Sequence, residues 1–247
     1  MTNPILVAVV NESTMLHDTA VSNVVAHLQT QIKRDFTPIW GIAADVWFYP
    51  SGSVVPANAW QMVVLDNSDQ AGALGYHELT ATGQPLAKIF VKDTVGAGDA
   101  WSVTMSHELC EMLVDPNTNL TVFNQTTNTA GELIVYETCD PVEDDQYGYA
   151  IGSIRVSDFV TPNYFIPGST GPWDFGKHLT APLQIITGGY LAVFNVNSGS
   201  GWTQIFGKKN SGWKQYTRSK DGKLIKSDVD ANDKRFIPRS EWKTSLK

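Results

Sequence analysis

The sequence predicts an α+β fold, with a mixed sheet covered by helices. Two observations carry this prediction. Apolar runs with β-branched residues recur at 5–10, 44–49, 61–66 and 86–91, as is typical of buried strands. Apolar residues also recur at helical spacing in residues 17–36 and 99–114. The order strand, helix, three strands, helix favours a layer of strands with the helices on one face.

The first helix is expected between residues 17 and 36. Its apolar positions recur three or four residues apart: Val21, Val24, Val25, Leu28 and Ile32. Pro38 marks the expected end, because proline disrupts a helix interior. The turn-rich segment 50–53 separates the next two strands, and Gly96 and Gly98 form a flexible entry to the second helix.

The second helix is expected at about 99–114. Its apolar stripe comprises Trp101, Met105, Leu109, Met112 and Leu113. Asp99 is the expected N-cap, and Pro116 disfavours a helical conformation at Asp115. These signals place the segment Ser-His-Glu-Leu-Cys-Glu (106–111) in the last turns of the helix.

His107 and Glu111 are candidate metal ligands, because residues four apart on a helix project from the same face. Glu108 lies about 100° around the helix axis and can lean over the ion as a general base. The competing interpretation is an amphipathic surface helix that carries these residues by chance, since glutamate is common in helices.

This strand order followed by a His-Glu-x-x-Glu helix resembles the zincin metallopeptidases, with Glu111 in place of their second histidine. The chain is similar to little-characterised bacterial and phage-type proteins that share an HExxE-ML-x-DP helix and a later Glu-x-x-Asp. The resemblance covers about residues 1–175. It implies a zincin-like domain over 1–175, followed by a strand-rich extension over 176–247. In zincins the strand before the motif helix is an edge strand that pairs with an extended substrate, and the resemblance implies this role for residues 87–92. The alternative is an ordinary edge strand that its lysines protect from pairing.

The resemblance also implies that Glu137 or Asp140 closes the metal site, because catalytic zinc commonly keeps three protein ligands. If this segment is helical, both carboxylates face one way; if it is extended, only one can be a ligand. A calcium-binding acidic loop or a solvated turn is the competing interpretation, since Glu143, Asp144 and Asp145 follow.

The implied activity is hydrolysis of peptide bonds by a metal-activated water, with Glu108 as general base and a peptide or protein as substrate. Zinc is the expected cofactor, with manganese or iron as alternatives because two carboxylates make a harder ligand set. Tyr147, Tyr149 and Tyr164 are candidate donors to a tetrahedral intermediate, with packing as the simpler role. The rival hypothesis is a non-catalytic structural or virion-associated protein with a zincin-like fold, holding a structural metal or none.

The later segments are expected to be irregular or strand-rich. Residues 117–128 are predicted as a loop or loose hairpin, residues 148–156 as a hairpin turning at Gly152, and residues 161–182 as irregular because they are rich in proline and glycine. His77 and His178 are expected to be structural or surface histidines.

Charge is divided unevenly along the chain. Up to residue 206 there are 6 Lys and Arg against 20 Asp and Glu, a net of −14, and from 207 onward 12 against 5, a net of +7. We therefore expect the basic tail to dock on the acidic body or on a partner, which offers a route to oligomers. Nucleic acid is not expected as a partner.

Cys110 and Cys139 are too few for a disulfide scaffold and form no CxxC pair. Each precedes a candidate ligand, so we predict a Cys110–Cys139 disulfide under oxidising conditions. Residues 5–10 are too short for a signal peptide or a membrane span. The expected location is cytoplasmic, or phage-associated with release by a non-standard route.

Overall fold

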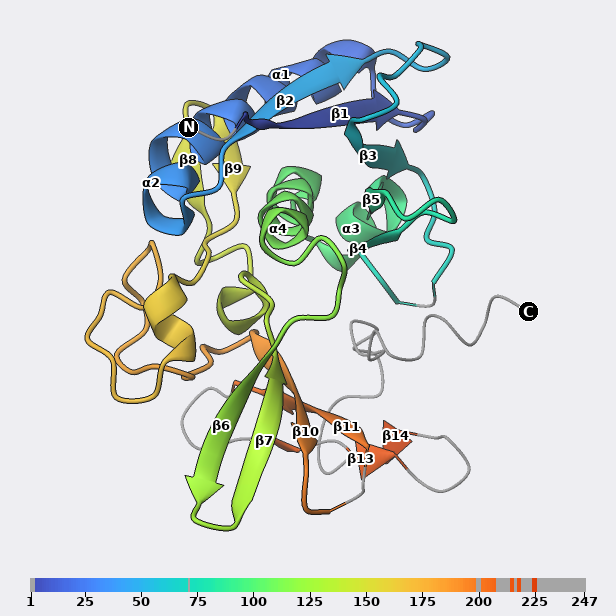
Figure 1. Ribbon diagram of the computed structural model, residues 1–247. Coiled ribbons are helices and arrows are strands. Elements are labelled where there is room, and N and C mark those ends of the chain that lie inside the picture. Colours follow the sequence, from blue (N-terminus) through green and yellow to red (C-terminus); the bar gives the residue numbers. More distant parts are fainter. Residues whose placement is uncertain are drawn as a thin grey trace.

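The computed structural model describes residues 3–70, 72–198 and 201–207, together with the backbone of short strands up to residue 225. Most of the basic tail lies outside the described residues, and with it the expectation that the tail docks on the acidic body. The described part is a mixed α+β structure with several sheets and few helices (Figure 1). Among the described residues, no helix is long and apolar enough to cross a bilayer.

The first sheet has the strand order β2-β1-β3-β5-β4. Neighbours among β1, β2, β3 and β5 are parallel, whereas β4 runs antiparallel to β5 at the edge. The strands are β1 (Ile5–Asn11), β2 (Ala44–Tyr49), β3 (Trp60–Leu65), β4 (Gly75–Leu79) and β5 (Pro85–Phe90). The expectation that residues 87–92 form an edge strand is wrong, because β5 is hydrogen-bonded to β3 on one side and to β4 on the other.

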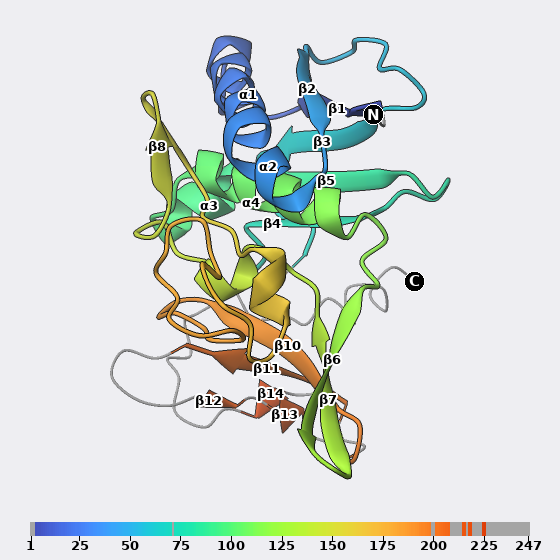
Figure 2. The same ribbon diagram turned by 60° about the vertical axis from the view of Figure 1, so that its left-hand side comes forward.

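One face of this sheet is buried under two helices, α1 (Asp18–Gln31) and α4 (Trp101–Val114). Alternate strand residues such as Val7, Val46 and Ala87 share a single apolar core with both helices. The Ser106 hydroxyl on α4 donates to Gln31 Oε1 at 2.7 Å, so the last residue of α1 contacts α4, which runs across below α1 in Figure 2. The expectation of strands with helices on one face is confirmed.

The first helical segment is longer than expected. After α1 the chain continues through a π-helical turn, η1 (Ile32–Phe36), into α2 (Thr37–Trp40), and ends at Gly41 with φ of +70°. Pro38 lies in the first turn of α2, where proline is tolerated because that N–H has no partner within the helix.

The segment before α4 is also helical: α3 (Val91–Ala97) ends at Gly98 with φ of +90°. The expectation that Asp99 caps α4 is wrong. The N-cap is Ala100, whose backbone N–H donates to Asp145 Oδ2 at 2.7 Å. The interpretation of α4 as a surface helix is also wrong, because from Ser102 to Val114 every residue except Thr104 is buried.

A second sheet has the order β12-β11-β10-β7-β6. Its strands are β6 (Thr121–Thr127), β7 (Ala130–Val135), β10 (Tyr190–Asn195), β11 (Trp202–Phe206) and β12 (Lys214–Gln215). The sheet therefore joins segments from both sides of the domain boundary expected at residue 175. Residues 117–128, expected as a loop or loose hairpin, supply β6 of a hairpin with β7 whose register shifts between Gln125 and Thr127, and the segment is polar and mostly exposed.

The remaining elements are short. The hairpin expected at 148–156 is confirmed as β8 (Tyr149–Ile151) and β9 (Ile154–Val156), turning at Gly152 with φ of +58°. Between them and the second sheet lie the 3₁₀ turns η2 (Asp140–Val142) and η3 (Pro162–Phe165), and β13 (Thr217–Arg218) pairs with β14 (Leu224–Ile225).

Candidate metal centre

The last two turns of α4 carry His107 and Glu111 on one face, as helical spacing requires. His107 Nε2 lies 3.2 Å from Glu111 Oε2. Both side chains are buried, and Glu111 is 0% exposed. A buried carboxylate is costly unless cations or hydrogen-bond donors surround it, so the surroundings of Glu111 determine what this site can hold.

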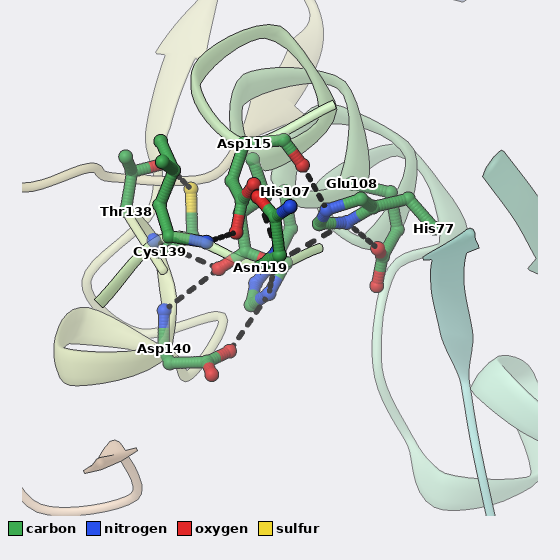
Figure 3. A network of polar contacts seen from close by, with 10 residues as sticks. His77, His107, Glu108, Asp115, Asn119, Thr138, Cys139 and Asp140 are labelled. Atoms are coloured by element: carbon green, nitrogen blue, oxygen red, sulfur yellow. Dashed lines mark hydrogen bonds and ion pairs between the residues drawn. The ribbon is translucent and has the colours of Figure 1, made fainter. Parts of the chain in front are cut away.

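Asp140 reaches the same point from η2, far along the chain. Its Oδ1 atom lies 3.2 Å from His107 Nε2. Figure 3 marks this contact with a dashed line. The segment is held there by Glu111 itself, whose Oε1 accepts hydrogen bonds from the backbone N–H groups of Cys139 at 3.1 Å and Asp140 at 3.3 Å. One oxygen of Glu111 therefore fixes the loop, and the other faces His107.

Two groups of buried side chains around Glu111 could hold a metal ion. His107, Glu111 and Asp140 form one, and His77, Glu111 and Glu137 form the other, with each group's ligand atoms within 4.8 Å of one another. Glu137 and Asp140 thus approach Glu111 from one segment but belong to different groups. Residues 136–139 are irregular, which is neither of the two geometries considered from the sequence.

His77 is the residue that sequence reasoning missed. It lies on β4 opposite Ala87, on the face that α4 covers, and is 1% exposed. Its Nδ1 atom is 3.4 Å from Glu108 Oε2 and 4.0 Å from Glu111 Oε2 (Figure 3). In the sequence, His77 is a single histidine in a short segment before a predicted strand, and nothing in that segment indicates toward which element its side chain points.

Glu108 is buried between α4 and the edge strand β4, with 4% of its surface exposed. The side chain fits because position 75 is glycine: a Cβ there would lie 3.0 Å from Glu108 Cγ and 2.8 Å from Thr104 Cγ2. The sequence therefore places Glu108 directly beside an exposed sheet edge.

The electrostatics of the centre favour positive charge. Burial lowers the pKa of His107, but the charge of Glu111 and a hydrogen bond to Asp140 outweigh it, so that the pKa is raised well above its usual value. The same two carboxylates that stabilise an imidazolium here would stabilise a cation bound to the neutral imidazole.

The spacing also fits one tetrahedral cation. Nitrogen and oxygen ligands at about 2.0–2.2 Å from zinc lie about 3.4 Å from each other in tetrahedral geometry. Both distances from His107 Nε2, to Glu111 Oε2 and to Asp140 Oδ1, are 3.2 Å. Both carboxylate oxygens therefore lie from His107 Nε2 at about the spacing that two ligands of one tetrahedral cation require.

The three candidate tyrosines are engaged elsewhere. The hydroxyl of Tyr149 donates to Asp35 Oδ2 and that of Tyr164 to the carbonyl of Gln184, each at 2.9 Å. The ring of Tyr147 packs edge-on against His178.

Cys110 and Cys139 are both buried free thiols behind the centre. Burial and a hydrogen bond with the Cys110 thiol raise the pKa of Cys139 well above its usual value. The two thiols therefore influence each other, and the predicted disulfide stays a prediction. Glu143 and Asp144 do not join either group around Glu111, and Asp145 accepts from the first turn of α4.

A third group, Asp158, Asp174 and His178, shares no residue with the two groups around Glu111. His178 Nδ1 is 3.0 Å from Asp158 Oδ2 and 3.2 Å from Asp174 Oδ2. The carboxylates also accept backbone N–H groups of Gly176 and Leu179, so this group ties together the loop around residues 174–179.

Comparison of the chain with models of known protein families, with curated proteins and with solved structures finds no match.

Proposed function

We propose that this chain is a metal-dependent hydrolase of peptide bonds with a zincin-like N-terminal half. The observation that carries the proposal is the convergence of His107, Glu111 and Asp140, with both carboxylate oxygens 3.2 Å from one imidazole nitrogen. A motif helix and a distant turn supply these ligands, and a further glutamate, Glu108, follows the histidine directly in the chain.

Zinc is the proposed cation, held by His107, Glu111 and Asp140. When bound, it would acidify a water molecule and polarise the carbonyl group of the substrate. Because two carboxylates and one imidazole supply more negative charge than two imidazoles and one carboxylate, manganese or iron also suits this set.

Glu108 is the proposed general base. It adjoins His107 in the chain, and its carboxylate is held at the inner side of β4. There it takes the proton of the attacking water and returns it to the leaving amine. Its burial keeps bulk water away from that proton transfer.

The substrate is proposed to be an extended peptide that pairs with β4. Among the described residues β4 is hydrogen-bonded only to β5, so its other side is an open sheet edge. An added strand would gain main-chain hydrogen bonds and lie next to Glu108. This position replaces the one expected for residues 87–92.

A second candidate function is a purely structural cation in a non-catalytic protein. Burial favours it: His107 is 7% exposed, Asp140 3% and Glu111 0%. A structural site is closed by protein on all sides, whereas a catalytic site keeps one position open. Access of a substrate to the centre therefore separates the two functions.

The test pairs metal analysis with turnover of a denatured protein by the wild type, Glu108→Gln and His107→Ala. Glu108→Gln should keep the metal and the fold but lose about 10²–10⁴-fold in rate, because only the base is removed. His107→Ala should lose the metal. Glu132→Gln, on β7 and outside the centre, is the matched control and should resemble the wild type.

Hydrolysis by Glu108→Gln at the wild-type rate would refute the catalytic proposal. So would a wild type with neither bound metal nor chelator-sensitive hydrolysis. Bound metal with no hydrolysis, and loss of the fold on chelation, would establish the structural cation instead.

A further inference from the structure

His77 is oriented by a bond that determines which ring nitrogen carries hydrogen. Its Nε2 atom lies 3.1 Å from the backbone carbonyl oxygen of Asp115, at the end of α4. A carbonyl oxygen only accepts hydrogen bonds, so Nε2 must donate. In the neutral ring, Nδ1 then presents its lone pair.

That lone pair faces two carboxylates. Nδ1 is 3.4 Å from Glu108 Oε2 and 4.0 Å from Glu111 Oε2, and all three residues are buried. Acceptors turned toward each other in a buried site repel unless a proton or a cation lies among them. Donation of the second ring nitrogen to a backbone carbonyl is also how metal-binding histidines are commonly fixed.

We propose that the chain binds a second divalent cation at His77, Glu111 and Glu137, next to the first, with Glu111 shared between the two. The three side chains present ligand atoms within 4.8 Å of one another. They come from three separate segments, β4, α4 and the loop before η2, which converge on this point. The inference rests on the proposed function, because the first cation at His107 belongs to that proposal.

The charge of the combined centre supports two cations. The four carboxylates of Glu108, Glu111, Glu137 and Asp140 are at most 4% exposed. Fully ionised, they carry four negative charges, which one divalent cation halves and two balance. Burying net charge is costly, so the balanced state is favoured. Two-cation sites occur in hydrolases, including aminopeptidases, where both ions stabilise the attacking and leaving groups.

The experiment counts metal ions on the full chain. The protein is loaded with Zn²⁺, freed of excess metal and analysed for zinc per chain by mass spectrometry. We expect about two ions for the wild type and about one for His77→Gln and for Glu137→Gln. Exposed His17→Gln is the matched control and should keep the wild-type content.

The outcomes separate this inference from the proposed function. One ion in the wild type, retained in His77→Gln and lost in His107→Ala, overturns the second site and leaves the first intact. No ion at all refutes the proposed function. An ion lost in His178→Gln but not in His77→Gln places the second cation at Asp158 and Asp174, which overturns the inference.

A titration with Co²⁺ covers the case in which a variant does not fold. Added to the wild type, Co²⁺ should give two successive phases in its visible absorption, whereas a single phase that ends at one ion per chain overturns the second site. This readout depends on neither hydrolysis nor a variant.

Discussion

Gly75 allows the edge strand β4 to lie close to α4, and replacing it with alanine tests this packing directly. A Cβ at this position would lie 2.8 Å from Thr104 Cγ2, 3.0 Å from Glu108 Cγ and 3.1 Å from the carbonyl oxygen of Lys88. The first contact is closer than real Cβ atoms approach, and the third is with rigid backbone. The helix and the strand must therefore separate slightly, or the Glu108 side chain must move.

Overpacking of this kind costs about 1–3 kcal/mol. Alanine also restricts the unfolded chain more than glycine does, which offsets about 0.4–1 kcal/mol. We expect a net destabilisation of about 1–2 kcal/mol, or a fall in Tm of about 2–8 °C for a chain of this size. Hydrolysis should fall as well, since Glu108 is displaced, while the content of the first metal site is unchanged.

The assay is thermal and urea unfolding of four proteins. Gly75→Ala should be destabilised, and Gly75→Ala combined with Thr104→Ser should recover part of the loss, because serine lacks the Cγ2 methyl that makes the closest contact. Gly96→Ala in α3 is the control, since a Cβ there meets nothing within 4 Å. If Gly75→Ala melts with the wild type, or if Thr104→Ser restores nothing, the packing argument fails.

Three further predictions concern other parts of the molecule. Burial and Asp174 raise the pKa of Asp158 to about 7 from 3.8, so the folded state binds more protons than the unfolded chain. The free energy of unfolding should therefore fall by up to about 4 kcal/mol as the pH rises from about 4 to 7. Asp158→Asn should flatten this pH dependence in urea unfolding, and a variant with the wild-type pH dependence would contradict the prediction. Treatment with oxidised glutathione should join Cys110 and Cys139 in a disulfide, so that a thiol assay on the subsequently unfolded chain finds neither thiol. Free thiols in that assay would rule the disulfide out. Saturating zinc should raise the Tm of the wild type, by an amount equivalent to about 2.7 kcal/mol at one hundred times Kd, and a chelator should reverse this. The double variant His77→Gln with His107→Ala, which removes a ligand from each proposed cation, should respond to neither.

The sequence was informative where one local rule determined the geometry. The spacing of His107 and Glu111 is enough to place both on one face of a helix, and Gly152 is enough to turn a short hairpin. Local signals failed where tertiary contacts replaced them. Ala100 is the N-cap of α4 in place of Asp99, and its backbone N–H donates to Asp145, which is distant in the chain. Of the two glycines expected to form a flexible entry, Gly96 lies inside α3 and Gly98 ends it.

Only part of the candidate site could be predicted from the sequence, because tertiary contacts position the rest. His77 matters because antiparallel pairing of β4 with β5 directs it toward α4, and no periodicity in a five-residue strand reveals that register. The roles of Glu137 and Asp140 were undecidable because an irregular segment sends them to different partners of Glu111. The polar strand β6 forms through its pairing with β7, and its own composition does not indicate a strand.

The pairing of β7 with β10 has a consequence for the order in which the centre forms during synthesis. Val193 pairs with Ile134, and the loop that this pairing closes contains Asp140. The carbonyl of Pro141, next to Asp140, accepts from Ile186 N–H, and Gly189 lies against the same turn. Closing so long a loop costs conformational entropy, and the hydrogen bonds and packing of the completed strands offset this cost. While β10 is still inside the ribosome, α4 can present His107 and Glu111, and the turn that carries Asp140 has its hydrogen bonds to Glu111 but not yet its contacts with Ile186 and Gly189.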